Sequence, residues 1–307
     1  MAFLYALTGA VAEGLIWGLM AIGVDISYKI LDIADLTVDG SICTGACVCA
    51  VLLGLGVPVW ICVPAALLTG ALAGTVTGLL HTLLGIPSIL AGILTQLMLY
   101  SVNLVILGGK SLMAVDHRAN VLMVHMSNNP MAIVAMIAMV AVTIIVLWQF
   151  FYTEVGLTLK STGDNPDMSR AQGVDVNRNK VIGLAIANGI VAMAGAMLAQ
   201  YKGSANINDG RGAIVIALAA IFIGLSVSLK IKPNFVVSLI GVVSGGVVYY
   251  IVYNFVILLG LKTDYLKMLS AVIVALFLGV PYMKAEYFTK QKMPQPNAKQ
   301  SGGKADA

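Results

Sequence analysis

Residues 40–80 read GSICTGACVCAVLLGLGVPVWICVPAALLTGALAGTVTGLL and contain no Asp, Glu, Lys or Arg. The charge-free stretch continues to Gly109, so that 70 residues (40–109) lie between Asp39 and Lys110. A helix that crosses a bilayer needs about 20 consecutive apolar residues. This stretch alone is therefore long enough for about three membrane spans.

The rest of the chain follows the same pattern. Of its 307 residues, 10% are charged and 59% are apolar, whereas a soluble domain carries about a quarter charged residues. This composition excludes an ordinary soluble enzyme. It predicts an all-α fold, a polytopic transmembrane helical bundle of about nine spans, with eight to ten compatible with the pattern. The expected spans are 6–24, 40–55, 59–81, 87–107, 131–150, 181–201, 212–229, 234–258 and 267–283.

No segment outside these spans is long enough to form a soluble domain. We expect a single transmembrane domain over residues 1–284 and a cytoplasmic, disordered tail over residues 285–307, which is rich in Gln, Pro, Gly and Ser. A second interpretation places the basic tail against anionic lipid. The formal net charge of +4 is too small to indicate nucleic-acid binding.

Basic residues indicate the orientation, because Lys and Arg concentrate in short cytoplasmic loops. If the segment 152–180 is cytoplasmic, that side carries 12 Lys and Arg residues and the opposite side carries six. We therefore expect a multi-pass protein of the inner (plasma) membrane with a cytoplasmic C-terminus. Nine spans place the N-terminus outside, and eight or ten place it inside.

Two patterns that resemble chemical sites are incomplete. The segment 109–111, Gly-Lys-Ser, resembles the end of a phosphate-binding loop, but the Gly required five residues before Gly109 is Leu104. Asp116, His117 and His125 share one expected outer loop, for which a solvated loop is a simpler explanation than a metal site. We expect no catalytic residues, no metal and no cofactor in this chain.

The first informative polar segment is 31–44, where Asp32, Asp35 and Asp39 approach an expected span. Asp39 either caps this span, since a helix dipole favours acidic residues in the first turn, or marks a broken helix beside a water-filled path. Polar groups at membrane depth often face the bundle interior, although hydrogen bonding between helices is the alternative. The candidates for lining a path are Asp39, Ser41, Thr44, Gln96, Asn103 and Asn188.

The second informative segment is 156–180, the longest polar stretch between spans. Asn165 is a favoured N-cap residue, and Pro166 suits the first helical position. Asp167 follows in the first turn, and Gly173 is placed to end the helix. The pattern predicts a helix of about two turns on the basic side of the membrane, held by its flanking spans. An ordinary cytoplasmic loop is the alternative.

This second segment resembles the coupling-helix region of permease subunits in ATP-binding-cassette importers, in the branch that includes branched-chain amino acid, ribose and nucleoside permeases. Further elements downstream, Gly210-Arg-Gly212 and 217–224, are similar, whereas Leu225 departs from the usual Gly. The run Leu36 to Ser41, LTVDGS, resembles a subgroup linked to tryptophan or tyrosine uptake. The matching residues of the second segment are Gly156, Lys160, Asn165, Pro166, Ala171, Gly173, Val174, Arg178 and Lys180.

The resemblance implies an ATP-driven importer that translocates a small polar solute, with an amino acid, and among these an aromatic one, as the expected class. Its implied partners are cytoplasmic ATPase subunits that bind ATP and Mg²⁺, a second copy of the permease in a homodimer, an extracytoplasmic substrate-binding protein and the lipid bilayer. The implied ATPase-coupling residues are Asn165, Pro166, Asp167, Met168, Ser169, Arg170, Ala171 and Gly173.

A self-sufficient secondary carrier or channel for a small solute is the alternative function. Such a carrier usually couples to ions through charged residues buried in its spans. Here Glu13 and Asp25 are the only ionisable candidates inside or near an expected span. This scarcity favours the externally powered permease.

Overall fold

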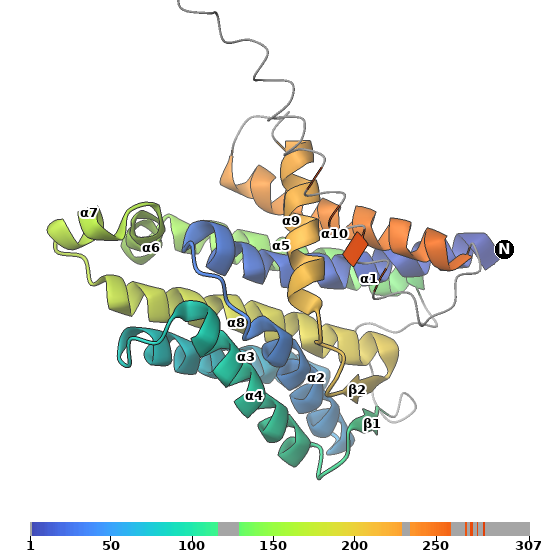
Figure 1. Cartoon of the computed structure of the whole chain (residues 1–307). Coiled ribbons are helices and arrows are strands. Elements are labelled where there is room, and N and C mark those ends of the chain that lie inside the picture. The colour runs from blue at the N-terminus through green and yellow to red at the C-terminus, as the bar shows by residue number, and fades with distance from the viewer. Residues whose placement is uncertain are drawn as a thin grey trace, which may run out of the picture.

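The computed structural model describes residues 2–115, 129–228 and 234–258, together with five single positions between 268 and 279. These residues form an elongated bundle that consists almost entirely of helices (Figure 1). The short helices α6 (Glu154–Asp164) and α7 (Pro166–Ala171) lie at one end of the bundle. The strands β1 (Leu112–Ala114) and β2 (Ser204–Asn206) lie toward the opposite end.

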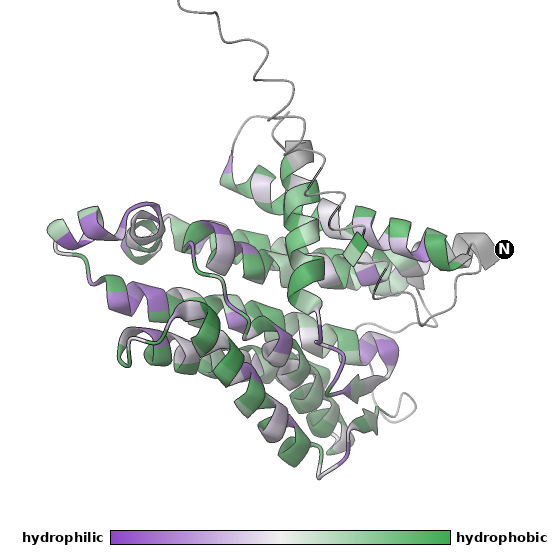
Figure 2. Cartoon of the chain, in the orientation of Figure 1, coloured by the Kyte–Doolittle hydropathy of each residue, from purple (hydrophilic) through white to green (hydrophobic). Residues whose placement is uncertain are grey.

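Six of the described helices are long and apolar enough to cross a membrane. Each coincides with an expected span, which confirms a polytopic helical bundle for this part of the chain. Hydrophobic residues dominate these helices, whereas hydrophilic residues gather on α6, α7 and the start of α8 (Figure 2). The six are α1 (Ala2–Asp25), α3 (Val59–Thr82), α4 (Ser88–Ile106), α5 (Asn129–Phe151), α8 (Val176–Lys202) and α10 (Phe235–Leu258).

Two other expected spans, 40–55 and 212–229, are shorter helices. Helix α2 (Val38–Gly54) has 17 residues and α9 (Ala213–Ser228) has 16. Such helices are about 25 Å long, which is less than the hydrocarbon thickness of about 30 Å. The ninth expected span, 267–283, falls outside the described residues except at single positions, and the tail 285–307 falls wholly outside them. The count of nine spans therefore stays a prediction.

Helices α1 and α8 form the centre of the bundle, and glycines let their neighbours approach closely. Gly70 and Gly74 of α3 lie against the backbone carbonyl groups of Asn188 and Leu184 in α8. A side chain at Gly74 would collide with that backbone, so the small residue is required by the packing. The four-residue glycine spacing thus serves contacts within one chain.

Two small elements were not predicted from the sequence. Helix α1 continues into a π-helical turn, Ile26–Ile30. Strand β1 pairs antiparallel with β2, with Met113 opposite Ala205. Because β1 follows α4 and β2 follows α8, this pair ties the ends of two helices together.

Candidate functional site

The first candidate site is the end of the bundle formed by α6 and α7. Asn165 joins the two helices in an extended conformation, with φ −158° and ψ 99°. Its side-chain Oδ1 accepts a hydrogen bond from the backbone N–H of Met168 at 3.0 Å. Pro166 then occupies the start of α7. The structure therefore has the capped helix that the cap residue and the Pro predict, with six residues, Pro166–Ala171.

Helix α7 is fastened to α6 by one buried side chain. Ser169 is 2% exposed. Its hydroxyl lies 3.2 Å from the Ser161 hydroxyl of α6 and 3.0 Å from the carbonyl oxygen of Asn165. Ser169 therefore positions the helix from within and presents no surface to a partner.

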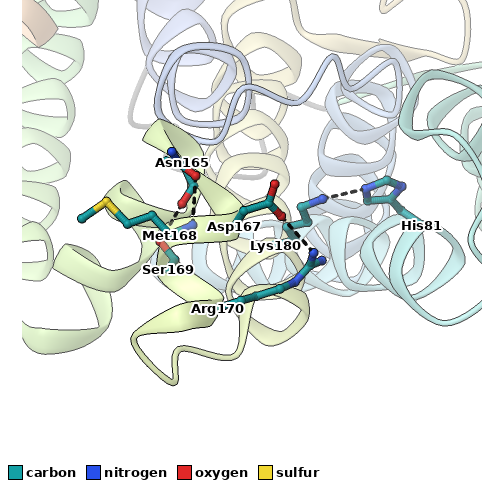
Figure 3. Close-up of polar contacts among 7 residues, drawn as sticks. All are labelled: His81, Asn165, Asp167, Met168, Ser169, Arg170 and Lys180. Carbon is teal, nitrogen blue, oxygen red and sulfur yellow. Dashed lines mark hydrogen bonds and ion pairs between the residues drawn. The ribbon is translucent and has the colours of Figure 1, made fainter.

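The other side chains of α7 form its exposed face. Met168 is 58% exposed, and Pro166 is also exposed. Asp167 and Arg170 form an ion pair at 3.5 Å, with side chains that are 91% and 57% exposed (Figure 3). An ion pair this exposed contributes little to stability, so both groups remain free to exchange partners. We call Pro166, Asp167, Met168 and Arg170 the α7 face.

The turn after α7 needs a glycine. Gly173 has φ +85°, a conformation that residues with a side chain rarely adopt. The backbone N–H of Val174 then donates to the carbonyl of Ser169 at 3.0 Å. Ala171 and Gly173 are exposed, beside the α7 face.

The first turn of α8 joins this end of the bundle to a central helix. Asp175 caps α8 by accepting from the backbone N–H of Arg178 at 3.1 Å. The amide of Asn179 donates to the hydroxyl of Thr162 in α6 at 3.0 Å. Gly163 of α6 also packs against the backbone of Ile30, at the end of the π-helical turn. Helices α6, α7 and α8 are thus held together by contacts that involve residues both before and after α7.

A further contact links α8 to α3 at the same end. The Nζ of Lys180 lies 3.3 Å from Nε2 of His81 (Figure 3). Nδ1 of His81 lies 2.8 Å from the carbonyl oxygen of Ile86, and the tautomer of the ring determines which of its nitrogens donates. The imidazole therefore lies between the Lys180 side chain and a backbone oxygen.

The second candidate site is a buried polar cluster before and within α2. The amide of Asn188 in α8 donates to the carboxylate of Asp35 at 2.6 Å, and its oxygen accepts from the Ser41 hydroxyl at 2.7 Å. Ser41 and Asn188 are each fully buried, and Asp35 is 2% exposed. Two of the expected path residues, Ser41 and Asn188, thus meet in a closed network that includes Asp35.

Thr37 extends this network to α3. Its backbone N–H donates to the Asp35 carboxylate at 2.8 Å, and its hydroxyl lies 2.7 Å from the hydroxyl of Thr77. Irregular backbone at this depth is tolerated because the polar groups find partners inside the protein. Thr37 and Thr77 were not singled out from the sequence. The spacing Asp35-x-Thr37, which allows a carboxylate to accept from the N–H two residues on, could have indicated the first of them.

Asp39 does not cap its own helix. Thr37 is the N-cap residue of α2, and Asp39 lies in the first turn. Its two carboxylate oxygens accept from the backbone N–H groups of Gly212 and Ile214, each at 2.9 Å. Asp39 therefore caps the start of α9, and the dipoles of two helices favour its negative charge.

The three remaining path candidates are separate from this network. The Thr44 hydroxyl donates to the carbonyl of Gly40 within α2. Gln96 of α4 is half-buried and lies beside Gly40. Asn103 is 1% exposed, and its Oδ1 has no hydrogen-bond partner within the described residues.

Comparison with known proteins identifies relatives over most of the chain. A family model described as "Branched-chain amino acid transport system / permease component" matches residues 6–280. A tyrosine transport system permease protein of Clostridioides difficile is 35% identical over 87% of this chain and 88% of its own length. The ribose import permease protein RbsC of Escherichia coli K12 is 25% identical over 84% of this chain and 79% of its own. No solved structure matches.

Proposed function

The chain belongs to the family of permease components of branched-chain amino acid transport systems, and within this family we propose that its solute is an aromatic amino acid. As a member, it is a multi-pass membrane protein and the permease subunit of an ATP-binding-cassette importer, whose ATPase is a separate subunit. The similarity to a tyrosine transport system permease supports the solute class. The LTVDGS run at Leu36–Ser41, which resembles the subgroup linked to tryptophan or tyrosine uptake, agrees with this class.

The α7 face is the proposed docking surface for the ATPase. The observation that carries this proposal is the division within α7, where Ser169 is buried against α6 while Asp167, Met168 and Arg170 are exposed. A helix of six residues is not stable alone, yet here it is fixed at both ends and presents two opposite charges and one apolar side chain. When ATP closes the ATPase pair, the motion reaches the membrane helices through the contacts of α6 and α8.

The proposed assembly contains two copies of the permease, two ATPases and an external binding protein. Nine spans and a cytoplasmic C-terminus would place α6 and α7 on the ATPase side. The β1–β2 pair, which lies toward the opposite end of the bundle, would then face the outside (Figure 1). The basic residues Lys29, Lys160 and Arg178 lie toward the α6–α7 end, as expected for a cytoplasmic face.

Reconstitution into liposomes tests the proposal. The permease, its ATPase and its binding protein would be combined, and uptake of labelled L-tyrosine, L-leucine and ribose would be measured with and without internal ATP. We expect ATP-dependent uptake of L-tyrosine above the other two solutes. ATP-dependent uptake of ribose alone would contradict the solute class. Uptake by the permease alone, driven by an ion gradient, would contradict the ATP-driven mechanism and favour a secondary carrier.

A further inference from the structure

Arg211 lies in the turn that precedes α9, directly before the glycine that donates to Asp39. Its guanidinium carbon is 6.0 Å from the centre of the Tyr100 ring in α4. This lies at the outer limit of the range, about 6 Å, within which a guanidinium is attracted to the face of an aromatic ring. The turn before α9 and helix α4 thus contact each other through the Arg211 side chain and the Tyr100 ring.

This contact lies inside the span of the neighbouring helices. Tyr100 is six residues before Ile106, the last residue of α4, which places it about 9 Å below that end. Asp39, to which the turn is bonded, is 15 residues before Gly54, the last residue of α2, or about 22 Å below the same side. A charged side chain at such depth is costly in lipid and is found facing water or a partner group.

No hydrogen bond or ion pair joins the Arg211 guanidinium to another residue that the structure describes. The Asp39 carboxylate accepts instead from the backbone N–H of the next residue, Gly212. Both oxygens of Asp39 already accept from backbone N–H groups of the α9 start. The five N–H donors of an arginine side chain are suited to bind a carboxylate through two parallel hydrogen bonds.

The surface around Arg211 is open. Arg211 itself is exposed, Tyr100 is 41% exposed and Val215 is 37% exposed. A Cβ atom added at Gly212 would have nothing within 4 Å. An exposed cation at this depth is expected to face an aqueous space or a partner group beside α4 and the start of α9.

We propose that Arg211, whose guanidinium lies over the ring of Tyr100, binds the carboxylate of the amino acid during its passage through the permease. The inference rests on the proposed function, because it assumes an amino acid as the solute and two copies that enclose an aqueous path. Arg211 supplies paired donors for the carboxylate. Tyr100 holds the guanidinium in place and offers a ring on which an aromatic side chain can stack.

The test compares Arg211→Gln with Arg211→Lys in the complete reconstituted importer. Uptake of L-tyrosine and ATP hydrolysis stimulated by the loaded binding protein are measured together. Since a charge-assisted hydrogen bond contributes roughly 1.5–3 kcal/mol, we expect Arg211→Gln to lower uptake about tenfold or more, with stimulated ATP hydrolysis retained. Arg211→Lys should keep part of the uptake. Lys110→Gln, which removes another exposed cation outside the helices, is the control and should transport normally.

A second measurement does not depend on transport. Phenylglyoxal, which modifies arginine from water, is applied to the wild-type complex, and the modified peptides are identified by mass spectrometry. We expect Arg211 to react, and L-tyrosine to protect it, whereas tyramine, which lacks the carboxylate, should not. An unreactive Arg211, or equal protection by both compounds, would overturn the proposal.

The transport results separate this inference from the function on which it rests. Uptake by Arg211→Gln within about twofold of the wild type would overturn the carboxylate site, and so would a loss of stimulated ATP hydrolysis together with uptake, which would indicate a structural role. A wild-type complex that transports no amino acid would contradict the proposed function instead. The protection experiment would then still decide whether Arg211 binds a carboxylate.

Discussion

The carboxylate of Asp39 lies 2.9 Å from the backbone nitrogen of Gly212, so that a side chain in the first turn of α2 caps the start of α9. The two residues are 173 positions apart in the chain. Both helices begin with backbone N–H groups that have no acceptor within their own helix. The Asp39 carboxylate accepts from two such N–H groups at the start of α9. Its negative charge is itself stabilised by the dipoles of both helices.

Replacement of this cap should destabilise the protein. Asp39→Ala removes both hydrogen bonds, and loss of an N-cap costs about 1–2 kcal/mol. Asp39→Asn keeps one acceptor oxygen and should have a smaller effect. Because all four cysteines are buried, a thiol-reactive fluorogenic dye can follow thermal unfolding in detergent. Asp167→Ala, which removes a carboxylate that is 91% exposed, is the control. Equal apparent Tm values for Asp39→Ala and the wild type would contradict the capping role.

The network around Asn188 should be sensitive to loss of its central amide. Asn188→Ala leaves the Asp35 carboxyl group with Thr37 as its remaining donor, and a buried polar oxygen that loses its partner costs about 1–3 kcal/mol, or more where it is charged. Ser41→Ala removes only a hydroxyl from the same network and should cost about 1 kcal/mol. The order of apparent Tm values checks this. Similar losses for the two variants would show that Asn188 does not hold Asp35.

The close contact between α3 and α8 should not accept a larger residue. Gly74→Val would force the added atoms against the backbone of Leu184, and overpacking of this kind costs about 1–3 kcal/mol or more. Leu72→Ala, on the exposed side of the same helix, should leave the apparent Tm nearly unchanged. The yield of folded protein by size-exclusion chromatography provides the second readout. A Gly74→Val protein as stable as Leu72→Ala would contradict the packing.

The α7 face should affect transport without affecting stability. Arg170→Glu reverses a charge that is 57% exposed, and an unfavourable charge pair at an interface costs several kcal/mol. We expect ATP-driven uptake to fall about tenfold or more while the apparent Tm stays the same. Ser169→Leu should behave differently and lower the apparent Tm, because the larger side chain cannot fit between α7 and α6. Normal uptake by Arg170→Glu would contradict the docking role.

The sequence predicted the helices where composition alone determines them. Uninterrupted apolar stretches gave α1, α3, α4, α5, α8 and α10 to within a few residues, because a span of about 20 apolar residues has few alternatives in a bilayer. The expected spans 40–55 and 212–229 likewise agree with α2 (Val38–Gly54) and α9 (Ala213–Ser228) to within a few residues. Hydropathy could not predict the hydrogen bonds of Asp35, Thr37 and Asp39 around the start of α2, because their partners lie elsewhere in the chain or depend on the local backbone.

The candidate sites were likewise predicted where their sequence signals are local, and were missed where they depend on residues that are distant in the chain. The α7 helix was predicted because its signals, Asn165, Pro166 and Gly173, are local and lie within nine residues. The burial of Ser169 could not be predicted, because it depends on Ser161 in a helix that the sequence did not reveal. Asp39 was recognised as a cap or path residue, but its partner Gly212 is remote in the chain. Arg211 and Tyr100 are brought together only by the tertiary fold.

Helix α8 runs for 27 residues without interruption, from the turn after α7 to the strand β2. At 1.5 Å per residue it is about 40 Å long, and it contains no proline or π-helical turn at which it could bend. A rod of this kind transmits displacement from one end to the other. We therefore expect a displacement at the β1–β2 pair to reach α7 through this one helix, which passes through the centre of the subunit.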